Sequence, residues 1–238
     1  MTQTIYFFKM GFWEVTLYLL NGFKLTCLLF ALTLVFALPL GLLVSFCTMS
    51  KYKPIQAIFR VIVWIVRGIP LMLQVFIIYY VPGFLHYNIF AKVDTYFYLQ
   101  YNMLDMGRFI AVVIAFSINY ACYFSEIFRG GIQSIPKGQY EASSVLGLSK
   151  SQTFFHIVLP QVIKRIVPPM SNEVITLVKD TALSRVILVS ELIMQAERLM
   201  AYALIWPLFY SGAFYLIFVG ILTILFNFIE KKLSYYKI

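Results

Sequence analysis

Residues 25–49 are LTCLLFALTLVFALPLGLLVSFCTM, a run that holds no charged side chain. A helix needs about 20 apolar residues to cross the hydrocarbon core of a bilayer, so this run is long enough to span it. The whole chain has the same character, since 61% of its 238 residues are hydrophobic and 12% are charged. Soluble domains carry about 25% charged residues. The sequence therefore predicts an integral membrane protein of the all-α class.

Further apolar segments predict a polytopic protein. We expect about five transmembrane helices, in a single transmembrane domain that occupies the whole chain, residues 1–238. The first 20 residues mix aromatic and polar side chains, which favours a separate helix lying at the membrane interface. The predicted spans cover residues 25–49, 55–80, 109–128, 168 to the mid-180s, and 206–229.

Lysine and arginine predict the orientation, because positively charged loops stay in the cytoplasm. These residues are concentrated after the first and third spans and at the C-terminal end. We therefore expect the N-terminus outside, the C-terminus in the cytoplasm, an extracytoplasmic loop at 82–107 and a cytoplasmic loop at 130–165. The net charge of +9 is then a topology signal. A nucleic-acid-binding protein would instead need a basic face on a soluble domain.

The sequence does not contain the residue patterns typical of metal sites, disulfide frameworks or ATP hydrolysis. Cys27, Cys47 and Cys122 are scattered through spans and match no metal or disulfide pattern. His86 and His156 are isolated, so we predict no metal site. The chain also holds no Walker phosphate-binding loop. We therefore expect it not to hydrolyse ATP by that route.

A polar segment, YEASSVLGLSKSQTFFHIVLP at residues 140–160, interrupts the apolar spans. Pro136 suits a helix start, and Gly147 suits a helix end. Ser149 and Gln152 have the spacing of a capping box that opens a second helix, which Pro160 would perturb. The pattern predicts two short helices joined by a sharp turn. An ordinary amphipathic linker would show the same pattern.

The spacing of this segment resembles the cytoplasmic EAA loop of ABC importer permeases. The match consists of Glu141, Ala142, Gly147, Ile157, Leu159 and Pro160, with Ser143 where the family usually has alanine. RGIP at 67–70, EIFRGGIQSIPKGQYEA at 126–142 and LVKDTALSRVILVSEL at 177–192 are similar to the polar amino acid permease branch, whose members carry histidine, glutamine, arginine or cystine. The resemblance covers roughly residues 15–235.

The resemblance implies a transport subunit of the bacterial plasma membrane that is not itself an enzyme. It implies a second permease subunit, identical or related, and two ATPase subunits that bind ATP and magnesium, so that this chain holds no cofactor. It also implies an extracytoplasmic binding protein that delivers a polar amino acid. The EAA loop would be the coupling helix that docks on the ATPase, through Glu141, Ala142, Ser143, Gly147, Ile157, Leu159 and Pro160.

Charged residues also occur inside the predicted spans. In SNEVITLVKD at 171–180, five polar side chains fall within about 120° of one helix face. Arg67 lies deep in the second span. A charge near the middle of a bilayer costs on the order of 3 kcal/mol, so these groups must face protein or water. The predicted substrate pathway consists of Arg67, Asn172, Glu173, Thr176, Lys179 and Asp180.

Two interpretations of these charges remain open. Arg67 could pair with Glu173 or Asp180 to hold the spans together. Alternatively, the charges could surround a cavity for a zwitterion, with cations for its carboxylate and acidic groups for its ammonium. Glu126 and Arg129 are three residues apart at the end of the third span, and we expect a structural ion pair there.

Two other classes of function would need different features in the sequence. An ion-coupled secondary transporter would share the buried charges, but it needs no docking loop, and five spans do not supply a pair of inverted repeats. A membrane hydrolase would need a nucleophile and a base, or metal ligands, at depth. The sequence supplies neither set. The sequence does not specify which amino acid is carried.

Overall fold

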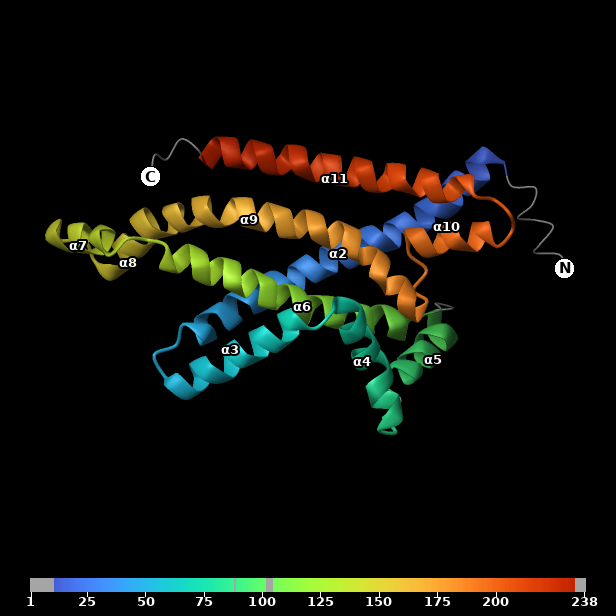
Figure 1. Cartoon of the computed structure of the whole chain (residues 1–238), viewed down its shortest axis with the longest axis horizontal. Coiled ribbons are helices and arrows are strands. Elements are labelled where there is room, and N and C mark those ends of the chain that lie inside the picture. The colour runs from blue at the N-terminus through green and yellow to red at the C-terminus, as the bar shows by residue number, and fades with distance from the viewer. Residues whose placement is uncertain (1–10, 88, 102–104, 234–238) are drawn as a thin grey trace.

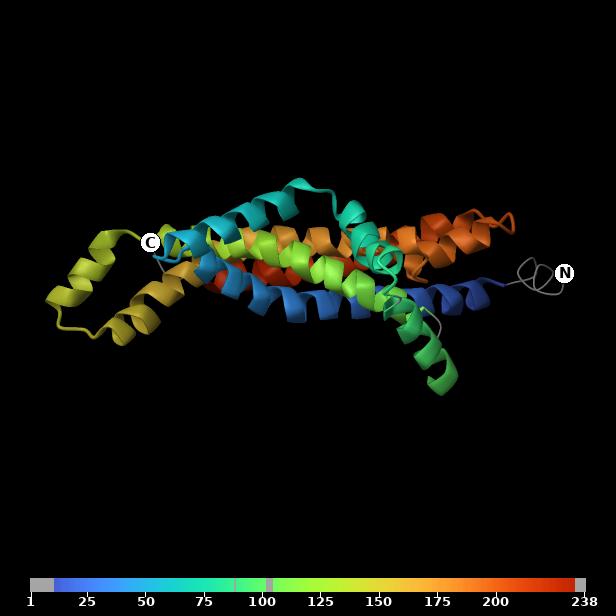
Figure 2. The same ribbon diagram turned by 90° about the horizontal axis from the view of Figure 1, so that it is seen from below.

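The computed structural model describes residues 11–87, 89–101 and 105–233, and within them it contains helices and no strands. The long helices α2, α6, α9 and α11 run along the length of an elongated bundle (Figures 1 and 2). The elements, in chain order, are α2 (Phe12–Thr48), α3 (Lys53–Gly68), α4 (Leu71–Phe84), α5 (Ile89–Tyr101), α6 (Met106–Gln133), α7 (Lys137–Val145), α8 (Lys150–Gln152), the π-helix η1 (Thr153–Val158), α9 (Leu159–Asp180), the 3-10 helix η2 (Thr181–Ile187), α10 (Leu192–Met200) and α11 (Trp206–Leu233).

Helix α2 includes both the first predicted span and part of the segment expected at the interface. Its 37 residues extend about 55 Å at 1.5 Å per residue, well beyond a hydrocarbon core of about 30 Å. Residues 12–20 therefore continue α2 and do not form the separate interfacial helix that was predicted for residues 1–20. Residues 1–10 lie outside the described part of the chain. The physical reason is an apolar partner, because Val15 and Leu19 are fully buried against α10.

The second predicted span, at 55–80, is broken. Helices α3 and α4 meet at an angle of 105°. Pro70 has no N–H to donate, and Ile69 before it is extended, with φ −99° and ψ 133°, as residues before proline prefer. The amide of Gln74 donates to the carbonyl oxygens of Val66 at 2.7 Å and Ile69 at 2.8 Å. One side chain thus satisfies backbone groups that the break would otherwise leave unpaired.

The segment at 82–107, expected to be a loop, contains helix α5. The start of α6 is fixed to it, because Asp94 Oδ1 accepts a hydrogen bond from the Gly107 N–H at 2.6 Å. A Cβ at Gly107 would lie 2.1 Å from the carbonyl oxygen of Phe90, so only glycine allows this approach. The carboxylate of Asp94 and the close approach at Gly107 therefore hold α5 against α6.

The fourth predicted span is part of a longer helix, because α9 starts at Leu159 and passes through Pro168 and Pro169. Three described helices, α2, α6 and α11, are long and apolar enough to cross a membrane, and the bent α3–α4 pair would make a fourth. Helix α9 is outside this set because it carries five charged residues. The all-α membrane fold is confirmed, whereas length and apolarity alone do not establish the number five.

The core lies mainly between α2, α6 and α9, where Leu29, Phe116 and Leu177 are fully buried. Gly41 of α2 allows the closest approach to α6. A Cβ there would lie 2.9 Å from the carbonyl oxygen of Ala121 and 3.0 Å from Phe124 Cβ. Small residues at such contacts let membrane helices pack backbone against backbone.

We expect Gly41→Leu to force α2 and α6 apart and to lower the stability of the purified protein by about 1–3 kcal/mol, the usual range for an overpacked core. Thermal unfolding in detergent, followed by size-exclusion chromatography, measures this effect. The control is Gly220→Leu on α11, where an added Cβ meets no atom within 4 Å. An equal loss of stability in both variants would contradict the packing argument.

Candidate functional site

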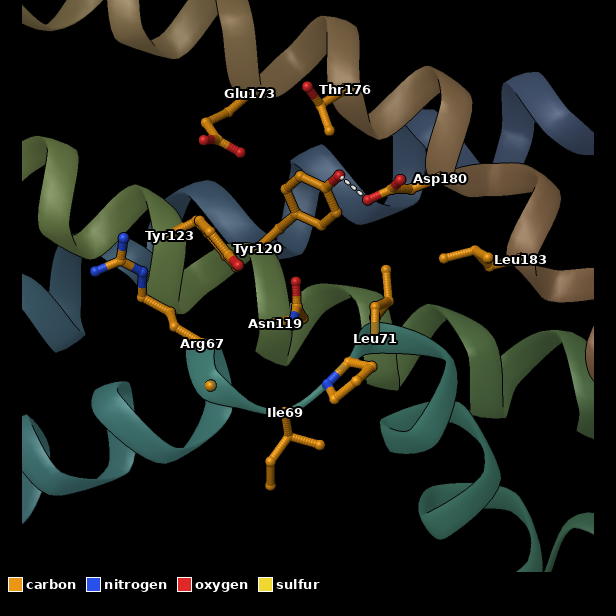
Figure 3. A pocket seen from close by; sticks show the side chains of 12 residues that line it. Arg67, Ile69, Leu71, Asn119, Tyr120, Tyr123, Glu173, Thr176, Asp180 and Leu183 are labelled. Atoms are coloured by element: carbon orange, nitrogen blue, oxygen red, sulfur yellow. Dashed lines mark hydrogen bonds between the residues drawn. The ribbon is translucent and has the colours of Figure 1, made fainter.

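A cavity of about 550 Å³ lies where the α3–α4 break faces α6, α9 and η2. Figure 3 shows Arg67 on one side of it and Glu173, Thr176 and Asp180 on the other. The lining residues are Arg67, Gly68, Ile69, Pro70, Leu71, Asn119, Tyr120, Tyr123, Glu173, Thr176, Asp180 and Leu183.

One wall of the cavity is the broken backbone between α3 and α4. Arg67 stands in the last turn of α3, and Leu71 is the first residue of α4. Both residues line the cavity, together with the three residues between them. Irregular backbone at membrane depth is tolerated where it lines a cavity, and discontinuous helices form binding sites in many transporters.

The opposite wall is one face of α9. Glu173, Thr176 and Asp180 are three and four residues apart, so they follow one another along that face. Tyr120 of α6 donates its hydroxyl hydrogen to Asp180 Oδ2 at 2.7 Å. This bond holds the carboxylate in place while the side chains of Glu173 and Thr176 stay available to the cavity.

The direct contacts of Arg67 are with α6, although its charge also acts on Glu173 of α9. Its guanidinium lies 5.0 Å from the ring centre of Tyr123, which favours a cation–π contact. The carboxylate within ion-pair distance of Arg67, at 4.0 Å, is that of Glu126 and not that of Glu173 or Asp180. The structure therefore does not contain the ion pair of Arg67 with Glu173 or Asp180 that was one of the two interpretations.

The expected ion pair of Glu126 and Arg129 is present. The Arg129 guanidinium donates to both carboxylate oxygens of Glu126, at 2.5 Å and 3.1 Å. Such two-point contacts are among the stronger polar interactions in proteins. Glu126 thus has one close partner, Arg129, and one distant partner, Arg67.

Two residues of the predicted pathway lie elsewhere. Asn172 and Lys179 are exposed and do not line the cavity. Each precedes a cavity residue, Glu173 or Asp180, and one position along a helix turns the side chain by 100°. Their part in a substrate pathway stays a prediction.

Helix α6 contributes cavity residues that were not predicted from the sequence. Asn119, Tyr120 and Tyr123 all line the cavity, and their spacing places them on one face of a helix. Asn119 is a polar residue within an otherwise apolar span, which is the signal that could have identified this face. The tyrosines gave no such signal in a chain that contains 17 of them.

A second candidate site is the turn between α6 and α9, which we call the elbow (residues 137–158). It projects beyond the long helices at one end of the bundle (Figure 2). Gly147 has φ +74°, a left-handed conformation that ends α7 as predicted. The capping box is present, since Ser149 N–H donates to Gln152 Oε1 at 2.9 Å and Gln152 N–H donates to Ser149 Oγ at 3.2 Å.

The predicted coupling residues differ in exposure. Glu141, Ala142 and Gly147 are exposed, Ser143 is buried, and Ile157, Leu159 and Pro160 are half-buried beside the start of α9. Ser143 donates its hydroxyl hydrogen to the carbonyl of Gln139 at 2.6 Å. The tip also presents two apolar side chains that the sequence reading did not single out, Val145 and Leu146, which are 87% and 75% exposed.

The base of the elbow is tied to the two helices that line the cavity. Ile135 of the α6–α7 connection, Val158 and Val162 form a buried cluster. A Cβ at Gly131 would lie 2.2 Å from Ile166 Cγ2, so α6 and α9 are in close contact there. Arg165 also donates to the carbonyl of Ser134. The base of the elbow is therefore packed against both α6 and α9.

Comparisons with known proteins identify the family of the chain. Residues 37–235 match the family described as binding-protein-dependent transport system inner membrane component. The L-cystine transport system permease protein TcyB of Bacillus subtilis (strain 168) is 36% identical over 96% of this chain and 90% of its own length. The arginine transport system permease protein ArtQ of the same organism is 33% identical over 91% of this chain and 93% of its own.

Solved structures show the same fold. A crystal structure of an amino acid ABC transporter with histidines superimposes with a TM-score of 0.75 and 29% identity, covering 91% of this chain and 94% of that one. The inward-facing MetNI methionine ABC transporter gives a TM-score of 0.63 at 16% identity, which concerns the fold alone. The chain therefore belongs to the family of inner membrane components of binding-protein-dependent transport systems, and it is a multi-pass protein of the plasma membrane.

Proposed function

We propose that this chain is the permease subunit of an ABC importer, and that the cavity between α3, α6 and α9 is where a polar amino acid is held during transport. The observation that carries the proposal is the placement of opposite charges on opposite walls. Arg67 faces Glu173 and Asp180 across a space of about 550 Å³. Relatives named for cystine and arginine transport support an amino acid as the substrate.

The charges suit a zwitterion. The guanidinium of Arg67 provides parallel N–H donors for an α-carboxylate, and the carboxylates of Glu173 and Asp180 accept from an α-ammonium. A volume of about 550 Å³ is within the 300–1,000 Å³ common for small-molecule sites. Glu126, 4.0 Å from Arg67, partly balances the charge of the guanidinium.

Helix α9 provides a direct mechanical connection between the elbow and the cavity. It begins next to the elbow at Leu159 and ends at Asp180, a length of about 33 Å. A displacement of the elbow would therefore be passed along one helix to Glu173, Thr176 and Asp180. This arrangement supports docking of the elbow on a separate ATPase as the source of motion.

The assembly that we propose contains two ATPase subunits, a second permease subunit and an extracytoplasmic binding protein. ATP and magnesium would bind to the ATPase subunits, so this chain would carry no cofactor and no enzymatic activity. The elbow and the C-terminal end would lie in the cytoplasm and the N-terminus outside, in keeping with the many cations near the elbow and the end of α11. No observation favours the ion-coupled alternative.

Removing either carboxylate from the cavity should weaken binding. We expect Glu173→Gln and Asp180→Asn each to lower the affinity of the purified permease–ATPase complex for its amino acid by about 10-fold or more, since a hydrogen bond to a charged group is worth about 1.5–3 kcal/mol. Equilibrium binding of radiolabelled amino acids measures this. Glu14→Gln, a similar change at an exposed position, is the control. Unchanged affinity in both cavity variants would rule out the cavity as the site.

Changing the bend of the elbow should uncouple the motor from the cavity. Valine is strained at the positive φ of Gly147, because β-branched residues are outliers there. We expect Gly147→Val to abolish uptake and substrate-stimulated ATP hydrolysis in liposomes, while amino acid binding by the cavity is retained. Gly138→Val, in α7 with open space around its Cα, is the matched control. Normal uptake by Gly147→Val would count against docking by the elbow.

A further inference from the structure

Helix α3 carries three cations at regular spacing, Lys53, Arg60 and Arg67, which we call the α3 cationic stripe. Seven residues turn an α-helix by 700°, only 20° short of two full turns, so the three side chains lie on one face. Successive members are about 10 Å apart along the helix. All three residues are exposed in the structure. The stripe therefore runs the length of α3, from its first residue to the cavity.

The position of Arg67 identifies what the stripe faces. Placing one cation in the hydrocarbon interior costs about 3 kcal/mol, so α3 cannot turn the face with Arg60 and Arg67 to lipid tails. Arg67, at one end, lines the cavity. Arg60, two turns away from the cavity, interacts electrostatically with Glu126, as Arg67 does. The face of α3 that holds the stripe thus continues away from the cavity along α6.

Helix α6 supplies a polar row beside the stripe. Tyr123 lines the cavity, and Glu126, Arg129 and Gln133 follow at intervals of three or four residues. These side chains are linked, because Arg129 donates to Glu126 at 2.5 Å and to Gln133 at 3.0 Å. The polar row ends with α6 at Gln133, next to the elbow. Two helices therefore carry polar groups from the cavity toward the elbow end.

We propose that the α3 cationic stripe is the exit route for the α-carboxylate of the substrate, which passes from Arg67 to Arg60 and then to Lys53. This inference rests on the proposed function, because it needs an amino acid in the cavity. The carboxylates of Glu173 and Asp180 lie on the wall opposite Arg67 (Figure 3). From Arg67 the stripe continues along α3 to Arg60 and Lys53. Because the cations of the stripe attract the α-carboxylate, a zwitterionic amino acid leaves the cavity with its carboxylate first.

Glu126 has a defined part in this route. Its carboxylate is held by Arg129 and reaches Arg67 at 4.0 Å, so it competes with a bound carboxylate for the guanidinium. That competition weakens the hold of Arg67 on the carboxylate and so favours its release from the cavity. Glu126 and Arg60 therefore act on release, whereas Arg67 acts on binding.

The test separates release from binding. The complete transporter, with its ATPase and binding protein, is reconstituted in liposomes, and uptake is compared with equilibrium binding to the cavity. We expect Arg60→Gln to lower the maximal uptake rate about 10-fold. The variant loses one polar contact between Arg60 and the carboxylate of the substrate, and the loss of one such contact corresponds to about a tenfold change. The affinity of the cavity should change less than about twofold, since Arg60 does not line it.

Three further variants make the result decisive. Arg60→Lys should restore most of the rate, because the charge is kept, and Lys53→Gln, at the exposed first residue of α3, should lower the rate in the same direction. Arg198→Gln on α10, a matched loss of an arginine away from the stripe, should leave the rate unchanged. Normal uptake by both Arg60→Gln and Lys53→Gln, or failure of Arg60→Lys to restore the rate, overturns the exit route. Absence of amino acid binding by the wild-type cavity would instead overturn the proposed function.

Discussion

A charged side chain cannot face lipid tails without a cost of several kcal/mol, and this constraint organises the whole chain. The charged side chains of α3, α6 and α9 must therefore lie where they contact polar protein groups or water. They meet at the cavity, where Arg67 stands opposite Glu173 and Asp180. The apolar faces of α2 and α11 remain on the outside of this group, which is why those helices are the clearest candidates to span the membrane.

The break between α3 and α4 and the continuity of α9 are complementary features. At the break, Pro70 ends one helix, and Gln74 pairs with the freed carbonyls, so that backbone can line a cavity at membrane depth. Helix α9 instead stays unbroken from the elbow to Asp180, although it contains two prolines after its first turn. One wall is thereby formed by irregular backbone that can adjust, and the other by a helix that can transmit displacement.

Part of the candidate site was accessible from the sequence. Charges inside apolar spans identified Arg67, Glu173 and Asp180, since the cost of burial does not depend on knowing the fold. The partner of Arg67 was not accessible, because a charge count cannot tell which carboxylate lies nearest. In the structure, Arg67 lies near Glu126. Asn172 and Lys179 point away from the cavity. A pattern within 120° of arc was too coarse to separate neighbours that differ by 100°.

By itself, the sequence determined the all-α membrane class, the bend at Gly147 with its capping box, and the family, because these depend on composition and on short-range spacing. Only the tertiary structure decided that residues 12–20 continue α2, that the second span is bent by 105°, and that α6 supplies Asn119, Tyr120 and Tyr123 to the cavity. The first and the third depend on contacts between residues far apart in the chain, and the size of the bend depends on where α3 and α4 pack. The helix propensity of a segment does not specify which distant helix will pack against it.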